Sequence, residues 1–196
     1  MQLNIFIISN PIINKLCNQI SHYGTKGKND IDTNISSQLK LLLIYEVLRK
    51  WINIQYIYIK DLDYIKEICI YSPTESYLLL TNVESCSNII PNIKTIMPKL
   101  SLIHTYLNLT KETYINIREN CLDDDIIGLM NRQKIIIMEN ILNNYAIMQL
   151  LDYLIFKQKI NIHQIKIICI ICTHKILKMI GSKYPLLNIY TAKITN

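Results

Sequence analysis

The stretch at residues 134–146, KIIIMENILNNYA, constrains the fold more than any other part of the chain. An apolar run at 135–137 is followed by a carboxylate, Glu139, then by a polar turn and a helical pattern. Strand, acid, turn and helix in this order place a phosphate or a ribose at the end of a parallel strand. The turn contains no glycine and is instead rich in asparagine: Asn140, Asn143 and Asn144.

Strands and helices alternate regularly after residue 133. We expect strands at 134–138, 165–172 and 187–192, a helix at about 143–157, and a helix that starts at Thr173. The run at 165–172 is apolar nearly throughout, as is typical of a strand covered on both faces of a parallel sheet. This alternation predicts a doubly wound α/β domain.

The first half of the chain mixes helical and extended patterns. Asn10 and Pro11 mark a helix start, and a second helix is expected at about 33–50, with Lys40 and Arg49 at its polar edge. Further on, strands are expected at 56–60, 67–71, 77–81 and 100–107, and a helix at 82–97. At 196 residues we expect one domain, with an N-terminal helical segment at 1–51 and an α/β core at 52–196.

The composition indicates a strong codon bias. About a fifth of the residues are isoleucine, whereas only two are alanine and three are arginine, which is typical of an AT-rich genome. No apolar run approaches the roughly 18 residues needed to cross a membrane, and no leader pattern precedes the first helix. We therefore expect a plastid stromal or a bacterial cytoplasmic protein without membrane contacts. The net charge of +6 follows from abundant lysine rather than from a nucleic-acid surface.

Two groups of residues could bind a metal ion, but each also has a simpler structural interpretation. Cys169 and Cys172 form a CxxC pair, but alternation along a strand would point them to opposite faces. Reduced thiols are expected for all six cysteines, rather than disulfides. The acidic run at 123–125 could hold a cation, but a solvated loop or a helix start accounts for it more simply. We expect no metal site in the chain itself.

Three stretches resemble the uracil phosphoribosyltransferase family. SNPIINKL at 9–16, a loop with Gly24 and Thr25, and LLLIYEVLRKW at 41–51 resemble that family's HPLI..KL, threonine-bearing loop and LL.YEA.R helix. IKIICIIC and SKYPLLNIYTAKIT resemble its IKVLCLVAA and YPDV.IYTAAID segments. The stretch at 134–146 stands where the family carries DPMLATGGS.

The resemblance implies a phosphoribosyltransferase-type fold with a doubly wound, mostly parallel sheet flanked by helices. It implies a reaction of pyrimidine salvage in which uracil and phosphoribosyl pyrophosphate give UMP and pyrophosphate, with Mg²⁺ as cofactor, and it allows a homodimer. In such a site an acid holds the ribose hydroxyls and a glycine-rich turn presents N–H groups to the 5′-phosphate. By position alone, the resemblance assigns substrate binding to four residues: Glu139, Asn140, Asn143 and Asn144.

The departures from the family pattern fall on positions that handle ligands. Asn144, Tyr145, Ala146 and Ile147 stand where the family has Thr-Gly-Gly-Ser. Glu84 stands near the family's RAGL segment, where a cation is expected. The family's C-terminal NE.GYIVPGLGDAGDR segment has no counterpart before the chain ends. Each lost oxyanion-type contact costs roughly 3 kcal/mol of transition-state stabilisation.

These departures predict a homologue with a degenerate site and little or no activity. The alternative is a non-catalytic structural or regulatory member of the same fold that binds another protein. No catalytic residue is assigned. Tyr145 is expected to fill the space left by glycine rather than to stack on a base.

Overall fold

The structure is a computed structural model that describes residues 3–23, 30–62, 64–83, 85–97, 99–105, 133–143 and 145–195, with side chains at 3–20 and from 34 onward. Its elements follow one another in this order: β1 (Asn4–Ile7), α1 (Pro11–Tyr23), α2 (Asp30–Arg49), β2 (Ile54–Lys60), β3 (Ile65–Tyr71), β4 (Tyr77–Thr81), α3 (Ile90–Ile96), β5 (Leu100–His104), β6 (Lys134–Leu142), α5 (Ala146–Asp152), the π-helical turn η2 (Tyr153–Lys157), the 3₁₀ turn η3 (Ile162–Gln164), β7 (Ile165–Thr173), α6 (His174–Lys183) and β8 (Asn188–Thr195). None of the helices in these ranges is long and apolar enough to span a membrane.

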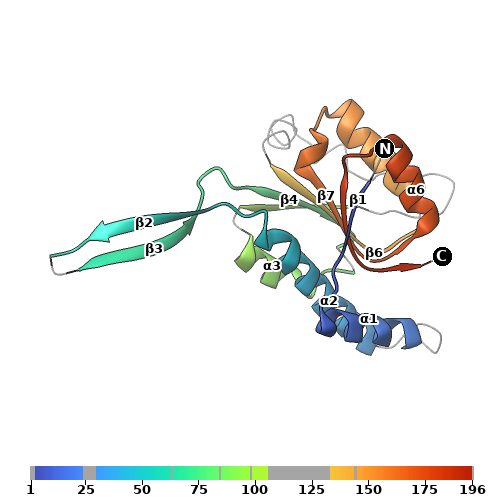
Figure 1. The fold of residues 1–196 in the computed structure, drawn as a ribbon, viewed down its shortest axis with the longest axis horizontal. Coiled ribbons are helices and arrows are strands. Elements are labelled where there is room, and N and C mark those ends of the chain that lie inside the picture. The colour runs from blue at the N-terminus through green and yellow to red at the C-terminus, as the bar shows by residue number, and fades with distance from the viewer. Residues whose placement is uncertain are drawn as a thin grey trace.

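Six strands form one sheet in the order β1-β8-β7-β6-β4-β5, and every neighbouring pair is parallel (Figure 1). The chain proceeds from β4 to the β5 edge, but from β6 it proceeds the other way, through β7 to β8. Helices cover both faces of this sheet. The predicted doubly wound α/β architecture is therefore confirmed.

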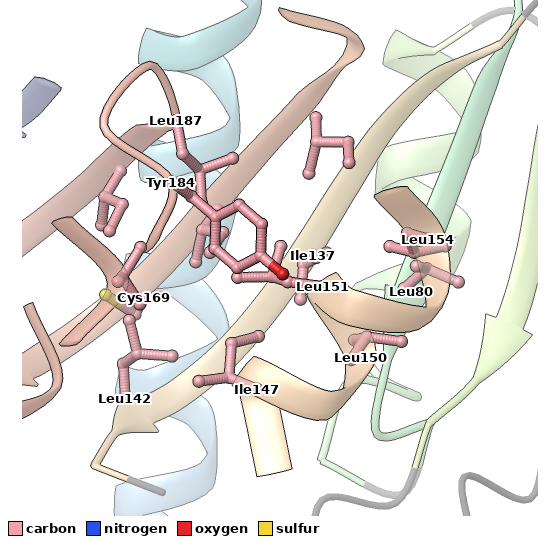
Figure 2. Packing of buried hydrophobic residues seen from close by; sticks show 14 of the residues in the cluster. Leu80, Ile137, Leu142, Ile147, Leu150, Leu151, Leu154, Cys169, Tyr184 and Leu187 are labelled. Atoms are coloured by element: carbon pink, nitrogen blue, oxygen red, sulfur yellow. The ribbon is translucent and has the colours of Figure 1, made fainter. Parts of the chain in front are cut away.

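Alternate residues of each central strand pack on opposite faces of the sheet. In β6, Ile135 and Ile137 join a core cluster with α5, η2 and α6, which we call the α5–α6 face (Figure 2). Ile136 and Met138 join a second cluster with α1, α2 and α3, which we call the α1–α3 face. Both faces are buried, which explains why β6 and β7 appear as continuous apolar runs in the sequence.

Several element boundaries differ from those predicted. β6 continues to Leu142 instead of ending at residue 138, so Glu139 and Asn140 lie in a strand rather than at the start of a turn. α3 begins only at Ile90, where a proline occupies an early helical position. β1 was not predicted at all, and it pairs with β8 through Asn4 and Asn188.

The prediction that Cys169 and Cys172 point to opposite faces is wrong. Both side chains are buried in the cluster of the α5–α6 face. The strict alternation of β7 breaks between them, because Ile170 and Ile171 are consecutive and both contact the α1–α3 face. All five described cysteines are free thiols.

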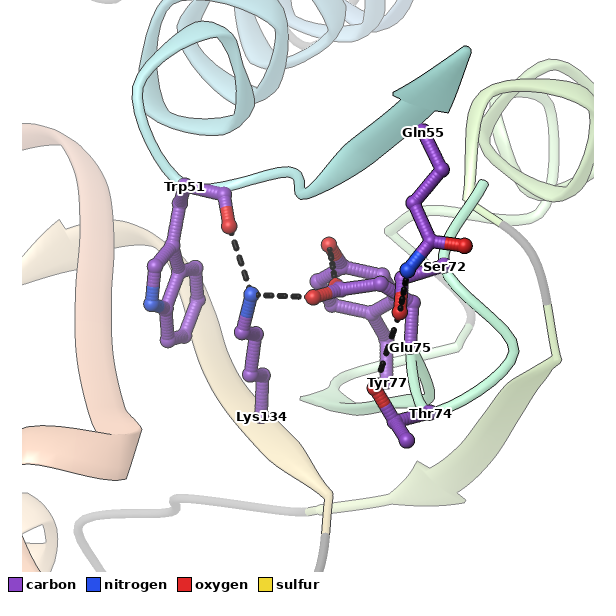
Figure 3. Close-up of polar contacts among 7 residues, drawn as sticks. All are labelled: Trp51, Gln55, Ser72, Thr74, Glu75, Tyr77 and Lys134. Carbon is purple, nitrogen blue, oxygen red and sulfur yellow. Dashed lines mark hydrogen bonds and ion pairs between the residues drawn. The ribbon is translucent and has the colours of Figure 1, made fainter. Parts of the chain in front are cut away.

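β2 and β3 form an antiparallel hairpin that stands away from the rest of the molecule (Figure 1). We call this hairpin, residues 54–71, the arm. Its register runs from Ile54 opposite Tyr71 to Lys60 opposite Ile65. At its base, the Lys134 Nζ donates to the Trp51 carbonyl oxygen at 2.6 Å and pairs with a carboxylate oxygen of Glu75 at 2.7 Å (Figure 3).

Candidate functional site

The candidate site lies where the direction of the fold reverses, at the carboxyl ends of β4 and β6. Ligands of open α/β sheets bind outside the strand ends at such a switch point. β4 and β6 are direct neighbours, and their register places Thr81 opposite Met138. The Thr81 hydroxyl donates to the Met138 carbonyl oxygen at 2.9 Å, which ties the two strand ends together.

Glu139 follows Met138 immediately and is the one predicted site residue with an unusual environment. Its Oε1 atom is buried and has no hydrogen-bond partner among the residues that the structure describes. Burial raises the pKa of Glu139 from 4.5 to about 7, although the charge of Lys40 acts to lower it. A buried carboxyl group that titrates near neutral pH is typical of functional sites, and it can accept or donate a hydrogen bond.

Two of the three predicted asparagines are described by the structure, and they lie in different environments. The Asn140 Oδ1 accepts a hydrogen bond from the Ser36 hydroxyl at 3.2 Å, so Asn140 connects the end of β6 to α2. Asn143 is exposed, just after the end of β6. Asn144 lies outside the described residues. Glu139 and Asn140 are therefore consecutive residues of β6, and Asn143 lies on the surface just after this strand.

Tyr145 does not fill an interior space, so that prediction is wrong. Its side chain is 51% exposed, and the Lys175 Nζ lies 5.4 Å from the centroid of its ring. The backbone of Tyr145 is already helical, and its side chain makes no capping hydrogen bond to α5. The ring lies outward because the following residues, Ala146 and Ile147, take the buried positions at the start of α5.

Lys40 belongs to the site, and the prediction that it lies at the polar edge of its helix is wrong. Its side chain is 1% exposed. The Lys40 Nζ donates to the Ser85 carbonyl oxygen at 2.8 Å and to the Cys86 sulfur at 3.3 Å. Lys40 is buried because the turn after β4 closes over it and satisfies its ammonium group. α2 thus brings a cation to the end of β4.

Hydrogen bonds within the fold already occupy several N–H groups of the turn between β4 and α3. The Val83 N–H donates to the His104 Nδ1 at 3.0 Å. The Cys86 N–H donates to the Val83 carbonyl oxygen at 3.1 Å, and the Ile89 N–H donates to the Cys86 carbonyl oxygen at 3.0 Å. These three groups are not free to bind an anion in this conformation.

Two buried polar atoms near the strand ends have no hydrogen-bond partner among the described residues. Besides Glu139, the hydroxyl of Thr105 is buried without a hydrogen-bond partner in the described part of the chain. Thr105 follows β5, and its N–H donates to the Thr81 carbonyl oxygen at 3.0 Å. Glu139 Oε1 could accept a hydrogen bond from a hydroxyl or N–H group of a ligand.

Three parts of the prediction lie outside the described residues. They are Glu84, which stands near the position of the family's RAGL segment, the acidic run at 123–125, and the loop with Gly24 and Thr25. Two site residues, Lys40 and Thr105, were missed at the sequence level. Thr105 carries no local signal, since a threonine within an extended pattern is ordinary.

Comparison with known proteins supports the family resemblance. No known protein-family model matches the chain. A uracil phosphoribosyltransferase homolog of Porphyra purpurea is 26% identical over 196 residues, which cover the whole of this chain and 90% of that protein. The solved structure of the AQ2163 protein from Aquifex aeolicus has a TM-score of 0.71 at 15% identity, over 97% of this chain and 86% of its own, and shows the same fold. The similarity to the Porphyra purpurea homolog over the full chain supports this protein as a divergent member of the uracil phosphoribosyltransferase family.

Proposed function

We propose that this protein is a family member with a degenerate site, which catalyses the formation of UMP from uracil and phosphoribosyl pyrophosphate slowly or not at all. The observation that carries the proposal is the closed turn after β4. Its Val83 and Cys86 N–H groups are bonded internally, and its Ser85 carbonyl oxygen holds Lys40. Pyrophosphate binding requires donors that point outward, so this turn would have to rearrange first.

The second argument concerns the expected 5′-phosphate loop. A phosphate is best held by a glycine-rich turn that leads into a helix, because the backbone can then approach the oxygen atoms closely. Here Tyr145 and Ala146 stand at the glycine positions, and both carry side chains. α5 has only 7 residues before the π-helical turn. This arrangement favours weak phosphate binding.

Residual ligand binding would depend on Glu139. The buried Oε1 is suited to a hydroxyl donor, such as a ribose hydroxyl. We propose Glu139 and Asn140 as the residues that contact such a ligand, with the exposed Asn143 beyond them; substrate binding by Asn144 stays a prediction of the resemblance. Phosphoribosyl pyrophosphate and uracil remain the proposed substrates of any residual reaction.

The described residues are a poor fit for resident Mg²⁺. They supply one carboxylate at the strand ends, Glu139, and its raised pKa disfavours the charged form that a hard cation requires. They contain no group of three or more potential metal ligands. We propose that Mg²⁺ would enter only as the companion of a bound diphosphate.

The alternative is a non-catalytic role in which the fold binds another protein chain. The arm favours this alternative, because it exposes apolar side chains far from the candidate site. A homodimer is one form that such an assembly could take. For the location, we propose the plastid stroma or a bacterial cytoplasm, on the strength of the codon bias.

An assay for UMP tests the proposed loss of activity. The purified chain is incubated with uracil, phosphoribosyl pyrophosphate and Mg²⁺, and calorimetry with phosphoribosyl pyrophosphate measures binding separately. We expect UMP formation many powers of ten below that of an active family enzyme assayed in parallel. Turnover that approaches that of the active enzyme and is abolished by Glu139→Ala would overturn the proposal. Thr95→Ala, in α3, serves as a matched control, because its exposed hydroxyl bonds only locally to Asn92.

A further inference from the structure

An open groove with a volume of about 630 Å³ lies between α6 and the β1 edge of the sheet. Cavities that hold small molecules usually have volumes of roughly 300–1,000 Å³. Side chains from the start of the chain, from α6 and from the end of β8 line the groove. In the sheet, β8 and β7 separate β1 from β6, so the groove is not part of the candidate site at the ends of β4 and β6.

Apolar side chains form the floor of this groove. Four residues contribute to it: Leu3 just before β1, Ile5 in β1, Leu177 in α6 and Ile194 in β8. Leu177 belongs to the core cluster of the α5–α6 face, and Leu3 and Ile194 pack against that cluster. Because the core holds three of these four side chains, the floor is already formed before a ligand arrives.

A glycine in α6 keeps the groove open. A Cβ atom added at Gly181 would lie 3.3 Å from the Cβ of Leu3 and 3.7 Å from its Cδ2. Any larger side chain at Gly181 would therefore occupy the space beside Leu3. Glycine within a helix is about 1 kcal/mol less favourable than alanine. The chain thus has a residue that weakens α6 and leaves the groove unfilled.

The polar edge of the groove is cationic. His174 and Lys178 are four residues apart in α6, so they lie on the same side of the helix. Lys178 is exposed and forms no ion pair within the described part of the chain. The third polar residue of this edge, Ser182, donates its hydroxyl to the Met179 carbonyl oxygen at 2.8 Å. No acidic side chain of the described residues lines the groove. An apolar floor with an unpaired cation at its edge favours a ligand that has an apolar body and a negative charge.

We propose that the groove binds an amphipathic carboxylate, such as a medium-chain fatty acid. Its apolar chain lies along the floor against Leu3 and Leu177, and its carboxylate pairs with the Lys178 ammonium group. The ring of His174 can supply a further hydrogen-bond donor to the same carboxylate. From His174 to Ser182 the groove follows α6 for about 12 Å, which suits an extended chain of this kind. This binding site is independent of any UMP-forming activity.

Calorimetry with decanoate on the full chain tests the proposal. We expect a dissociation constant of about 1 mM or tighter, the value for a ligand of about twelve non-hydrogen atoms at ordinary efficiency. Acetate, which lacks the chain, and decyltrimethylammonium, which has the opposite charge, should each bind at least about tenfold more weakly. These two probes separate the contribution of the floor from that of the cation.

Three variants assign the binding to the groove. Lys178→Glu should raise the dissociation constant for decanoate by about tenfold, because repulsion replaces attraction. Its matched control is Lys94→Glu, which makes the same change of charge at an exposed position of α3, on the other face of the sheet, and should leave the constant unchanged. Gly181→Leu should abolish binding, because its side chain fills the groove beside Leu3. Thermal unfolding checks that this variant is folded, and Lys178→Glu decides the question if it is not.

A decanoate that carries a diazirine locates the site directly. After illumination, peptide mass spectrometry should find the crosslinks in peptides that contain Leu3, Ile5 or Lys178. Absence of binding at about 10 mM decanoate, well above the expected constant, would overturn the proposal. So would equal binding of decyltrimethylammonium, equal effects of Lys178→Glu and Lys94→Glu, or crosslinks spread over the surface of the protein.

Discussion

Replacing Lys134 with methionine should destabilise the fold, because the buried carboxylate of Glu75 would lose the positive charge that it pairs with. The Lys134 Nζ lies 2.7 Å from Glu75, whose side chain is only 2% exposed. It also donates to the Trp51 carbonyl oxygen and lies 5.5 Å from the centroid of the Trp51 ring. Methionine keeps most of the apolar stem and removes only the charge and its donors (Figure 3).

The expected cost is about 3 kcal/mol in the free energy of unfolding. Removing one partner of a buried ion pair costs about 3–5 kcal/mol, because the other charge stays buried without compensation. The lower end applies here, since Lys134 is 21% exposed and the Tyr77 hydroxyl still donates to Glu75. For a chain of this length, this cost corresponds to a fall in Tm of roughly 6–12 °C.

Urea and thermal unfolding of three variants measure this effect. Lys183→Met is the matched control, because Lys183 lies 2.6 Å from Asp152 but both side chains are about 40% exposed. Such an exposed pair should contribute about 1 kcal/mol or less. The double variant Lys134→Met/Glu75→Gln should be more stable than Lys134→Met alone, since no unpaired charge remains. Equal losses for Lys134→Met and Lys183→Met, or no recovery in the double variant, would refute the reasoning.

Three further predictions concern the candidate site and the first helix. Between pH 5 and pH 8, Glu139→Gln should gain stability relative to the wild type, by about 3 kcal/mol at most. The folded pKa of Glu139, about 7, exceeds its ordinary value of 4.5, so the wild type loses stability as the pH rises through that window. If urea unfolding gives the same difference between variant and wild type at both pH values, this prediction is contradicted. Lys40→Met should cost about 1–3 kcal/mol in the free energy of urea unfolding, because the Ser85 carbonyl oxygen loses its donor. It should also raise the pKa of Glu139, and so move the pH-dependent change in stability to higher pH. An unchanged pH dependence would exclude the influence of Lys40 on Glu139. Asn10→Ala should cost about 1 kcal/mol in thermal unfolding, because the Ile12 N–H loses its cap at 2.9 Å; a change within error would show that the cap is dispensable.

The periodic part of the fold could be predicted because its signals are local. Three signals each specify structure within a few residues: the continuous apolar runs of β6 and β7, the Asn10–Pro11 helix start, and Thr173 before α6. β1 lacked such a signal. It is only 4 residues long, it is exposed at the sheet edge, and its partner residue Asn188 lies near the other end of the chain. Its pairing depends on the assembled sheet.

The position of Glu139 in the candidate site could also be predicted, but its raised pKa and its unpaired oxygen could not. A carboxylate directly after a buried apolar run at the end of a parallel strand is a local feature, and Glu139 lies there. Its unpaired Oε1 and raised pKa depend on how far β6 continues and on which groups the neighbouring strand ends supply. Those properties belong to the tertiary structure.

For Lys40, burial could be predicted from local sequence, but its hydrogen-bond partners could not. Within α2 it stands four residues before Ile44 and seven before Val47, and both of those side chains are buried. This spacing puts Lys40 on the buried stripe of the helix. A lysine on such a stripe must find acceptors inside the protein, because an unpaired buried ammonium is costly. The pattern could therefore have indicated that Lys40 is buried, but only the closed turn after β4 reveals that Ser85 and Cys86 receive it. The same contact that makes burial of Lys40 tolerable uses the Ser85 carbonyl oxygen, and so connects α2 to the closed turn after β4.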